Sequence, residues 1–333
     1  MQEKIKIYLP NDIYQIILKD MELFEFYKKD GSLNRNEFLN KLITNYYEIY
    51  SLNNEKVLES IKQKLFNSDI DENAVEDMAL SILYSLDFNH LELNHKRNNV
   101  TISMKPTKDT SFIFDYISDN LLNGTTLSGY LRSLISSYVH IPQDKRERIL
   151  FKDNYELVDK AIQNNKKIYF VIKRYDKETR HIVSPFAIEN SKEELFNYLL
   201  ADKDSVPMSF RISRIKNLAV LNESASFSSL SLDSFQKMIK NGPQFAYGEK
   251  ENNPIKIKLT DAGKLKYTRI YLHRPDYREI ENNNIYVFDC SYLQATQYFE
   301  RFGSDAIVLE PQDLRDRFEL FYNKARKAYK YTE

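Results

Sequence analysis

The stretch Lys167–Leu221 reads KIYFVIKRYDKETRHIVSPFAIENSKEELFNYLLADKDSVPMSFRISRIKNLAVL, and it decides the fold of the middle of the chain. Four segments in and around it are rich in β-branched and aromatic residues and therefore predict strands. They are Ile168–Lys173, Arg180–Ile188, Leu195–Ala201 and Ser209–Ile212. Asp, Asn and Ser between the segments supply turn chemistry. Short strands at this close spacing predict a small barrel or sandwich.

Three short motifs in this stretch resemble, in order and spacing, those of a WYL domain. They are Pro185-Phe186, then Asn197-Tyr198-Leu199-Leu200-Ala201, then Phe210-Arg211-Ile212-Ser213-Arg214-Ile215. The resemblance covers Asn164 to Leu221 and implies a small Sm- or SH3-like β-barrel with a ligand pocket. The chain has no Trp, so Asn197 stands where the name-giving Trp would be, and Met208 and Ser213 are further departures.

The resemblance also implies which side chains form the pocket. Tyr198, Arg211 and Arg214 match pocket-forming positions of the family, and Arg180 or His181 takes the place of its strand arginine. The predicted pocket is Tyr198, Arg211, Arg214, Arg180, His181 and Lys173. Arginine offers a planar fork to phosphate, and tyrosine offers a stacking face to a base. The alternative is that Arg211 pairs with a local carboxylate and that Tyr198 belongs to the core.

The first 150 residues contain an internal repeat. Phe38–Tyr46 aligns without gaps on Tyr130–Tyr138, and a strand of alternating polar and apolar residues precedes each copy, at Lys4–Leu9 and at Val100–Met104. A strand followed by two helices resembles a ribbon-helix-helix unit, whose strand must pair with a second copy. We predict an intramolecular pseudo-dimer, with two unrelated helical hairpins as the alternative. Helices at Val57–Phe66 and Ala74–Leu86 are expected to join the copies.

The pseudo-dimer would gather polar side chains on the outer face of its ribbon. These are Lys4, Lys6, Tyr8, Thr101, Ser103 and Lys105. Such ribbons enter a DNA major groove, although an exposed edge made polar for solubility is the alternative. Backbone N–H groups at helix starts attract phosphate. The residues expected there are Asn34, Arg35, Thr126 and Ser128.

The end of the chain predicts an α+β domain. The expected order β, β, β, α, β, α covers Ile255–Leu259, Tyr267–Leu272, Asn284–Cys290, Tyr292–Phe302, Ala306–Leu309 and Gln312–Tyr329. Phe302-Gly303, Leu309-Glu310-Pro311 and Leu314-Arg315 resemble the extension that follows many WYL domains, which implies a ferredoxin-like fold used for dimerisation or nucleic-acid contact. Because Phe318, Phe321 and Tyr322 offer apolar surface on the last helix, we expect a homodimer.

Composition narrows the possible functions. The 48 Lys and Arg balance the 48 Asp and Glu, so an anion site must be a local patch rather than bulk positive charge. Cys290 is the single cysteine, and no apolar run approaches the ~18 residues of a membrane span, which makes a cytoplasmic protein the default. There is no Gly-rich phosphate loop, and His90 and His95 lack further metal ligands. We expect no catalytic set, no metal and no cofactor.

The predicted class is an α+β multidomain protein with boundaries at 1–150, 151–225 and 226–333. A ribbon-helix-helix pseudo-dimer, a WYL domain and its extension together resemble the WYL accessory proteins of type VI-D CRISPR loci. This resemblance implies a non-enzymatic partner of an RNA-targeting effector nuclease that binds single-stranded RNA and stimulates the effector. The alternative is a DNA-binding transcription regulator whose WYL pocket senses a nucleotide or nucleic-acid ligand. A nuclease in its own right would need a catalytic set that the sequence does not show.

Overall fold

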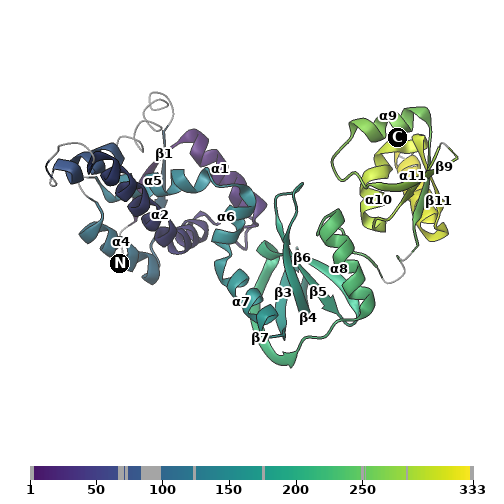
Figure 1. The fold of residues 1–333 in the computed structure, drawn as a ribbon, viewed down its shortest axis with the longest axis horizontal. Helices are drawn as coiled ribbons and strands as arrows, with labels where there is room; N and C mark the ends of the chain where they lie inside the picture. The colour runs from purple at the N-terminus through teal and green to yellow at the C-terminus, as the bar shows by residue number, and fades with distance from the viewer. Residues whose placement is uncertain are drawn as a thin grey trace. The chain divides into compact units, whose positions relative to one another are not determined.

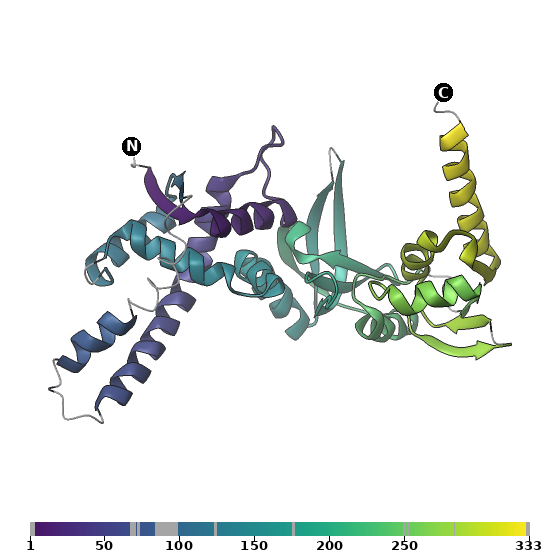
Figure 2. The same ribbon diagram turned by 90° about the horizontal axis from the view of Figure 1, so that it is seen from above.

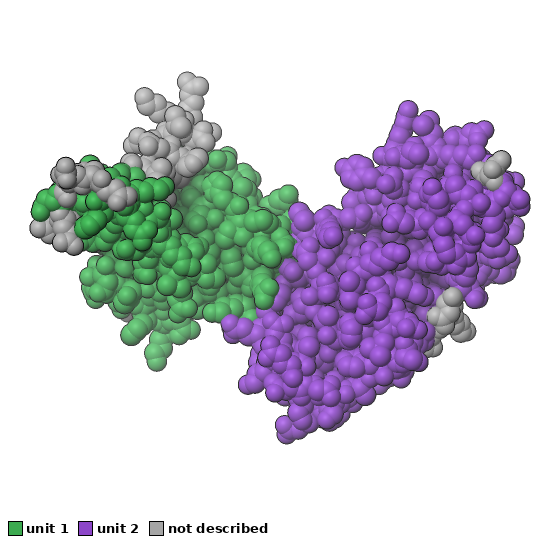
Figure 3. Space-filling view, viewed as in Figure 1, with its two compact units in different colours: residues 1–152 green, residues 153–333 purple. Residues whose placement is uncertain are grey.

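The computed structural model describes residues 4–66, 71, 74–83, 99–122, 125–174, 177–248, 251, 253–282 and 284–330. The chain divides into two compact units, residues 1–152 and 153–333 (Figure 3). Over the described ranges the fold is α+β, with antiparallel sheets of two, five and four strands. None of the helices in these ranges is both long and apolar enough to cross a membrane.

In unit 1, Ile5–Pro10 (β1) and Asn99–Met104 (β2) form an antiparallel two-stranded ribbon. Ile7 pairs with Ile102 at its centre, and both side chains are fully buried. The alternation of each strand thus places one face in the core and the other in solvent. The predicted pairing of two strands that lie far apart in the sequence is confirmed.

In unit 1, helices lie beside the ribbon and beside one another (Figure 2). They are Asn11–Leu23 (α1), Arg35–Phe66 (α2), Lys108–Asn120 (α4), Leu127–Val139 (α5) and Gln143–Leu150 (α6). The apolar positions of the repeat are buried in both copies, namely Phe38, Leu39, Leu42, Ile43 and Tyr46, then Tyr130, Leu131, Leu134, Ile135 and Tyr138. The two copies also meet directly, since Tyr46 Oη lies 2.8 Å from Ser137 Oγ.

The helical segment predicted at Val57–Phe66 is present. It forms the last part of α2, which runs unbroken for 32 residues because no Gly or Pro interrupts it. Residues 74–83 are helical as expected, and residues 84–86 of the predicted Ala74–Leu86 helix lie outside the described ranges.

Unit 2 begins within the helix Lys152–Gln163 (α7), since Lys152 is the last residue of unit 1. A five-stranded antiparallel sheet of order β6-β5-β4-β3-β7 follows. The strands are Lys166–Arg174 (β3), Lys177–Asn190 (β4), Asn197–Lys203 (β5), Val206–Arg211 (β6) and Ile215–Ser224 (β7). The four predicted strands are present. The pattern missed β7, an edge strand whose alternation is broken at Asn217, where φ is 52° and the register shifts nearby.

Helix α8, Ser229–Asn241, covers part of this sheet (Figure 1). Phe235 and Met238 of α8 pack with Leu200 of β5, Tyr247 and the partly buried Phe186 of β4. Ser228 caps the helix, since its side chain accepts a hydrogen bond from the Ser231 N–H. The connection from β7 to α8 is thereby fixed over the face of the sheet.

The last part of unit 2 is a four-stranded antiparallel sheet of order β11-β8-β10-β9 with its own helices. Its elements are Ile255–Leu259 (β8), Asp261–Arg269 (α9), Tyr277–Glu281 (β9), Ile285–Phe288 (β10), Tyr292–Phe299 (α10), Ala306–Glu310 (β11) and Gln312–Lys330 (α11). A short 3₁₀ segment, Glu300–Asp305 (η2), leads into β11.

A strand was wrongly predicted at Tyr267–Leu272. Its first three residues end helix α9, which Thr260 caps by accepting from the Gly263 N–H at 3.0 Å. The helix packs closely on the chain before β11, because a Cβ at Gly263 would lie 2.1 Å from the Asp305 carbonyl oxygen. The apolar and aromatic residues of this run therefore pack a helix and its exit. The strand that follows α9 in the sheet is β9, Tyr277–Glu281.

The apolar surface expected on α11 is smaller than predicted. Phe318 is buried in the core of its own sheet, and Tyr322 packs against that core and donates a hydrogen bond to the Glu300 carbonyl oxygen. Phe321 stays 41% exposed and Leu320 56% exposed. Near the middle of α11, these two apolar side chains remain available for contact with another surface.

Candidate functional site

The outer face of the ribbon carries the polar set that the sequence predicted. Lys4, Lys6, Tyr8, Thr101, Ser103 and Lys105 are all exposed. Lys6 pairs with Ser103 and Tyr8 with Thr101, so their side chains lie beside each other on one face. Among the exposed residues of β1 and β2 there is no carboxylate. This face therefore combines positive charge, hydroxyl groups and one half-exposed aromatic ring.

Helix α2 holds the end of β2 in place through two asparagines. Asn36 accepts from the Lys105 N–H at 2.7 Å. Asn40, which is 6% exposed, donates to the Lys105 carbonyl oxygen at 3.1 Å and accepts from the Thr107 N–H at 3.0 Å. Sequence reasoning missed Asn40, although a polar residue within the apolar face of the repeat was a usable signal.

Three of the four residues predicted at the helix starts form hydrogen bonds within unit 1. Thr126 caps α5 by accepting from the Gly129 N–H at 3.1 Å. Asn34 donates to the Glu37 carboxylate at 2.7 Å, which puts a negative charge at the start of α2. Arg35 donates to Tyr14 Oη at 2.7 Å, and the Ser128 hydroxyl is buried with no hydrogen-bond partner among the described residues. Of the two starts, α5 is the one better suited to a phosphate, because no acidic residue lies in its first turn.

The predicted WYL pocket is only partly assembled. Tyr198 of β5 and Arg211 of β6 are direct cross-strand neighbours. The Arg211 guanidinium lies 3.2 Å from the centre of the Phe196 ring, and its Nε donates to Ser213 Oγ at 2.9 Å. The Tyr198 hydroxyl donates to the Glu194 carboxylate. Arg214 closes the 3₁₀ turn Ile212–Arg214 (η1) that follows β6.

The other three predicted pocket residues lie elsewhere. Arg180 and Lys173 are exposed on the outer face of the β3–β4 hairpin, where Arg180 is opposite Val171 and Lys173 opposite Glu178. His181 follows Arg180 directly and so points to the opposite face. The prediction of one cluster that contains both Arg180 and His181 was therefore wrong.

His181 is half-buried and packs against the aromatic core of the five-stranded sheet. Its ring stacks on Phe170 at 5.2 Å and meets the edge of Phe210 at 4.9 Å. Burial, followed by the positive charge of Lys203, lowers the pKa of His181 below its usual value. The imidazole is therefore a neutral packing group at pH 7.

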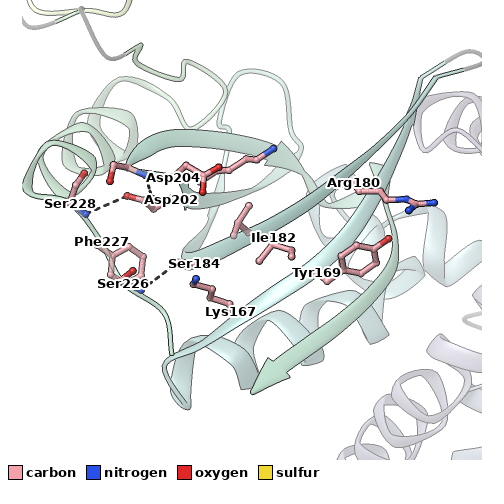
Figure 4. A pocket seen from close by; sticks show the side chains of 13 residues that line it. Lys167, Tyr169, Arg180, Ile182, Ser184, Asp202, Asp204, Ser226, Phe227 and Ser228 are labelled. Atoms are coloured by element: carbon pink, nitrogen blue, oxygen red, sulfur yellow. Dashed lines mark hydrogen bonds between the residues drawn. The ribbon is translucent and has the colours of Figure 1, made fainter. Parts of the chain in front are cut away.

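A cavity of about 720 Å³ opens on the outer face of the same sheet (Figure 4). Its walls come from β3, β4, the β5–β6 turn and the connection from β7 to α8. Lys167, Arg180 and Lys203 contribute positive charge, Asp202 and Asp204 contribute carboxylates, and Tyr169 and Phe227 contribute rings. Of the predicted pocket residues, Arg180 alone lines it.

Hydrogen bonds fix one wall of this cavity. Asp202 accepts from the Ser205 N–H at 2.8 Å and from the Ser228 N–H at 3.4 Å. The Ser226 N–H donates to Ser184 Oγ at 3.0 Å, as the dashed lines in Figure 4 show. The cavity thus contains cationic side chains that could bind an anionic group and aromatic rings that could stack on a planar apolar group.

The structure offers no centre for metal or thiol chemistry in the ranges that it describes. No three His, Cys, Asp or Glu side chains there are grouped to hold a metal ion. His90 and His95 lie outside the described ranges. Cys290 is buried, and burial raises the pKa of its thiol far above the usual value, so the thiolate that would react is not formed near pH 7.

Comparison with known proteins gives a likeness of fold. Neither a protein-family model nor a curated protein matches the sequence. One solved structure, described as the crystal structure of a CRISPR Cas-related protein, matches 100% of this chain and 96% of its own, with a TM-score of 0.70 and 22% sequence identity. Proteasome accessory factor B/C of Arthrobacter aurescens covers 99% of this chain and 50% of its own at 13% identity, with a TM-score of 0.27 that is too low to bear on the fold. The chain thus shares its fold, over its full length, with a protein described as CRISPR Cas-related.

Proposed function

We propose that this chain is a non-enzymatic, cytoplasmic accessory protein of a CRISPR antiviral system that binds nucleic acid, with single-stranded RNA as its preferred ligand. Its role is to raise the activity of an RNA-targeting effector nuclease. The fold likeness to a CRISPR Cas-related protein and the sequence resemblance to the type VI-D accessory proteins support the cellular context. The ribbon supports the binding of nucleic acid.

The observation that carries the proposal is the composition of the outer ribbon face. In a chain of zero net charge, this face presents three lysines and no carboxylate among its exposed described residues. Ammonium groups neutralise phosphates, and Thr101 and Ser103 can donate hydrogen bonds to phosphate oxygens. Tyr8, 47% exposed, offers its ring to an unstacked base, which favours a single strand over a duplex.

A binding assay with the full chain tests this proposal. Affinity is measured for single-stranded RNA, single-stranded DNA and duplex DNA over a salt series. We expect single-stranded RNA to bind tightest, and Lys4→Ala with Lys6→Ala to weaken binding and reduce the salt slope by roughly 0.7 per lost contact. Lys19→Ala with Lys28→Ala, two exposed lysines of the same unit, is the matched control. If the Lys4/Lys6 variant binds all three ligands as the parent does, the ribbon is not the interface.

The cavity favours a second candidate, a DNA-binding transcription regulator that senses a nucleotide or nucleic-acid ligand. Arg180 would hold a phosphate, and Tyr169 or Phe227 would stack on a base. Titration calorimetry with mononucleotides and short oligonucleotides tests it. This candidate requires that a ligand bind the parent, that Arg180→Ala abolish the binding, and that duplex DNA be preferred over RNA.

A further inference from the structure

A groove on unit 1, between α2 and α4, exposes aromatic side chains. It has a volume of about 510 Å³, and Tyr47, Phe112, Ile113 and Tyr116 form its apolar lining. Phe112 is 78% exposed and Tyr116 48% exposed. The rings of Tyr47 and Tyr116 meet edge-on at 6.2 Å. An exposed aromatic patch in a groove is typical of a surface that another molecule covers.

The internal repeat shows that the fold does not require these rings. Helices α1 and α4 are both 13 residues long, and alignment from their first residues matches the buried Ile17 with the buried Phe114. The same alignment matches Phe112 with Gln15, and Gln15 is exposed and polar. The equivalent of Tyr116 is Lys19, which is also exposed. One copy therefore presents two aromatic side chains where the other presents polar ones, so a copy can fold without rings at these positions.

The charges around the groove define what can enter it. The carboxylates of Glu48 and Asp109 line it against the ammonium of Lys108, and Glu55 lies on the same helix as Glu48. None of these three carboxylates forms an ion pair within the described part of the chain. The pKa of Tyr47 is raised by burial first, and then by Tyr116, Glu48 and Glu55. A negative rim repels phosphate and attracts a positively charged segment.

We infer that the α2/α4 groove docks a basic amphipathic helix of a protein partner. Apolar side chains of that helix would lie on Phe112, Tyr116 and Tyr47, and its Lys or Arg side chains would face Glu48 and Asp109. This is the helix-in-groove mode, in which aromatic anchors at the centre carry most of the affinity. The inference deepens the proposed function, because an accessory protein that acts on an effector needs a protein-binding surface besides its nucleic-acid surface.

The test uses the full chain and two labelled model helices. One helix carries Leu on one face and Lys on the other, and its counterpart carries Glu in place of Lys. The groove variant is Phe112→Gln with Tyr116→Gln, which removes the rings without a change of charge. The matched control is Gln15→Ala with Lys19→Ala at the equivalent positions of α1. Because all four side chains are exposed, these variants should fold as the parent does.

The parent and the control should bind the Leu/Lys helix at least about tenfold more tightly than the Leu/Glu helix, and the groove variant should lose at least about tenfold of that affinity. Glu48→Gln with Asp109→Asn should weaken the same binding and its salt dependence. Equal affinity for the two helices, or a groove variant that binds as the parent does, overturns the inference.

Two further outcomes would assign the groove to another occupant and overturn the inference. One is protection of α4 amides from hydrogen exchange by single-stranded RNA rather than by the Leu/Lys helix. The other is a shift of the oligomeric state in the groove variant, which would indicate a second copy of the chain. Lys4→Ala with Lys6→Ala should leave helix binding unchanged, so failure of the proposed function and failure of this inference are distinguishable.

Discussion

Asp20 is a fully buried carboxylate in unit 1, and its partners make it the most consequential single residue there. It accepts hydrogen bonds from Tyr138 Oη at 2.8 Å and from Arg146 Nε and Nη2 at 2.7 and 2.8 Å. We predict that Asp20→Ala costs about 3–5 kcal/mol of the free energy of unfolding, because Arg146 is left buried without its counter-charge. Urea unfolding measures this cost. Glu22→Ala, at an exposed position of the same helix, should have little effect, and equal losses in the two variants would contradict the prediction.

The position of His181 predicts how stability depends on pH. Its pKa is lowered in the folded state, so the unfolded chain binds the proton more tightly. The neutral ring contributes fully to the free energy of unfolding above the ordinary histidine pKa of about 6.5, and this contribution is lost as the pH falls below that value. His181→Phe should therefore lose less stability than the parent between about pH 7.5 and pH 5.5, whereas His140→Gln, on the exposed end of α5, should behave as the parent does. Parallel losses in all three proteins would show that His181 does not carry this effect.

At the scale of elements, Asn40 joins the start of α2 to the end of β2. Its side chain donates to one backbone carbonyl beyond β2 and accepts from the Thr107 N–H. Asn40→Ala should remove one of the two acceptors of the Thr107 N–H, since Thr110 Oγ1 also accepts from it at 2.8 Å, together with the closest acceptor of the buried Thr110 hydroxyl, at 2.6 Å. We expect a cost of about 1–3 kcal/mol and faster exchange of the Thr107 amide hydrogen. Hydrogen exchange read residue by residue measures it. A Thr107 amide as protected in Asn40→Ala as in the parent would mean that the ribbon does not depend on this contact.

At the scale of the whole molecule, unit 1 should fold alone. Both strands of the ribbon and both copies of the repeat lie within residues 1–152, so no second chain is needed to pair β1. We expect a fragment of residues 1–152 to be folded and monomeric at micromolar concentration. Circular dichroism and sedimentation measure this, and a fragment that folds only as a dimer would contradict it.

We propose that homodimerisation belongs to the C-terminal sheet and its last helix. Since Phe318 is buried and Tyr322 packs on the same core, the contact is assigned to Leu320 and Phe321, which remain exposed. Leu320→Glu with Phe321→Glu in the full chain should shift sedimentation from dimer to monomer, because two buried charges oppose association. Glu319→Ala is a control on the same helix that should stay dimeric. A parent that is itself monomeric, or a charged variant that stays dimeric, defeats the assignment.

Local pattern was enough to predict the ribbon. The alternation over Lys4–Leu9 and Val100–Met104 predicts which side chains face inward, and the repeated helix indicates that the chain holds two copies of one unit. Both signals depend on neighbours within one element, so tertiary contacts did not alter them. The same alternation separates Arg180 from His181, which is why a pocket that contains both was inconsistent with the strand that holds them.

By itself, the sequence determined the α+β class, the positions of most strands and the polar outer face of the ribbon, because each follows from periodicity inside a single segment. Tertiary structure alone decided the rest. The cavity exists because the β5–β6 turn and the connection from β7 to α8 meet over the sheet, held by Asp202 and Ser184. Tyr267 lies in a helix because Gly263 lets α9 pack on the backbone at Asp305, a contact between residues 42 positions apart. Such contacts form between segments that are distant in sequence, and the residues of one segment do not predict which other segment it will contact.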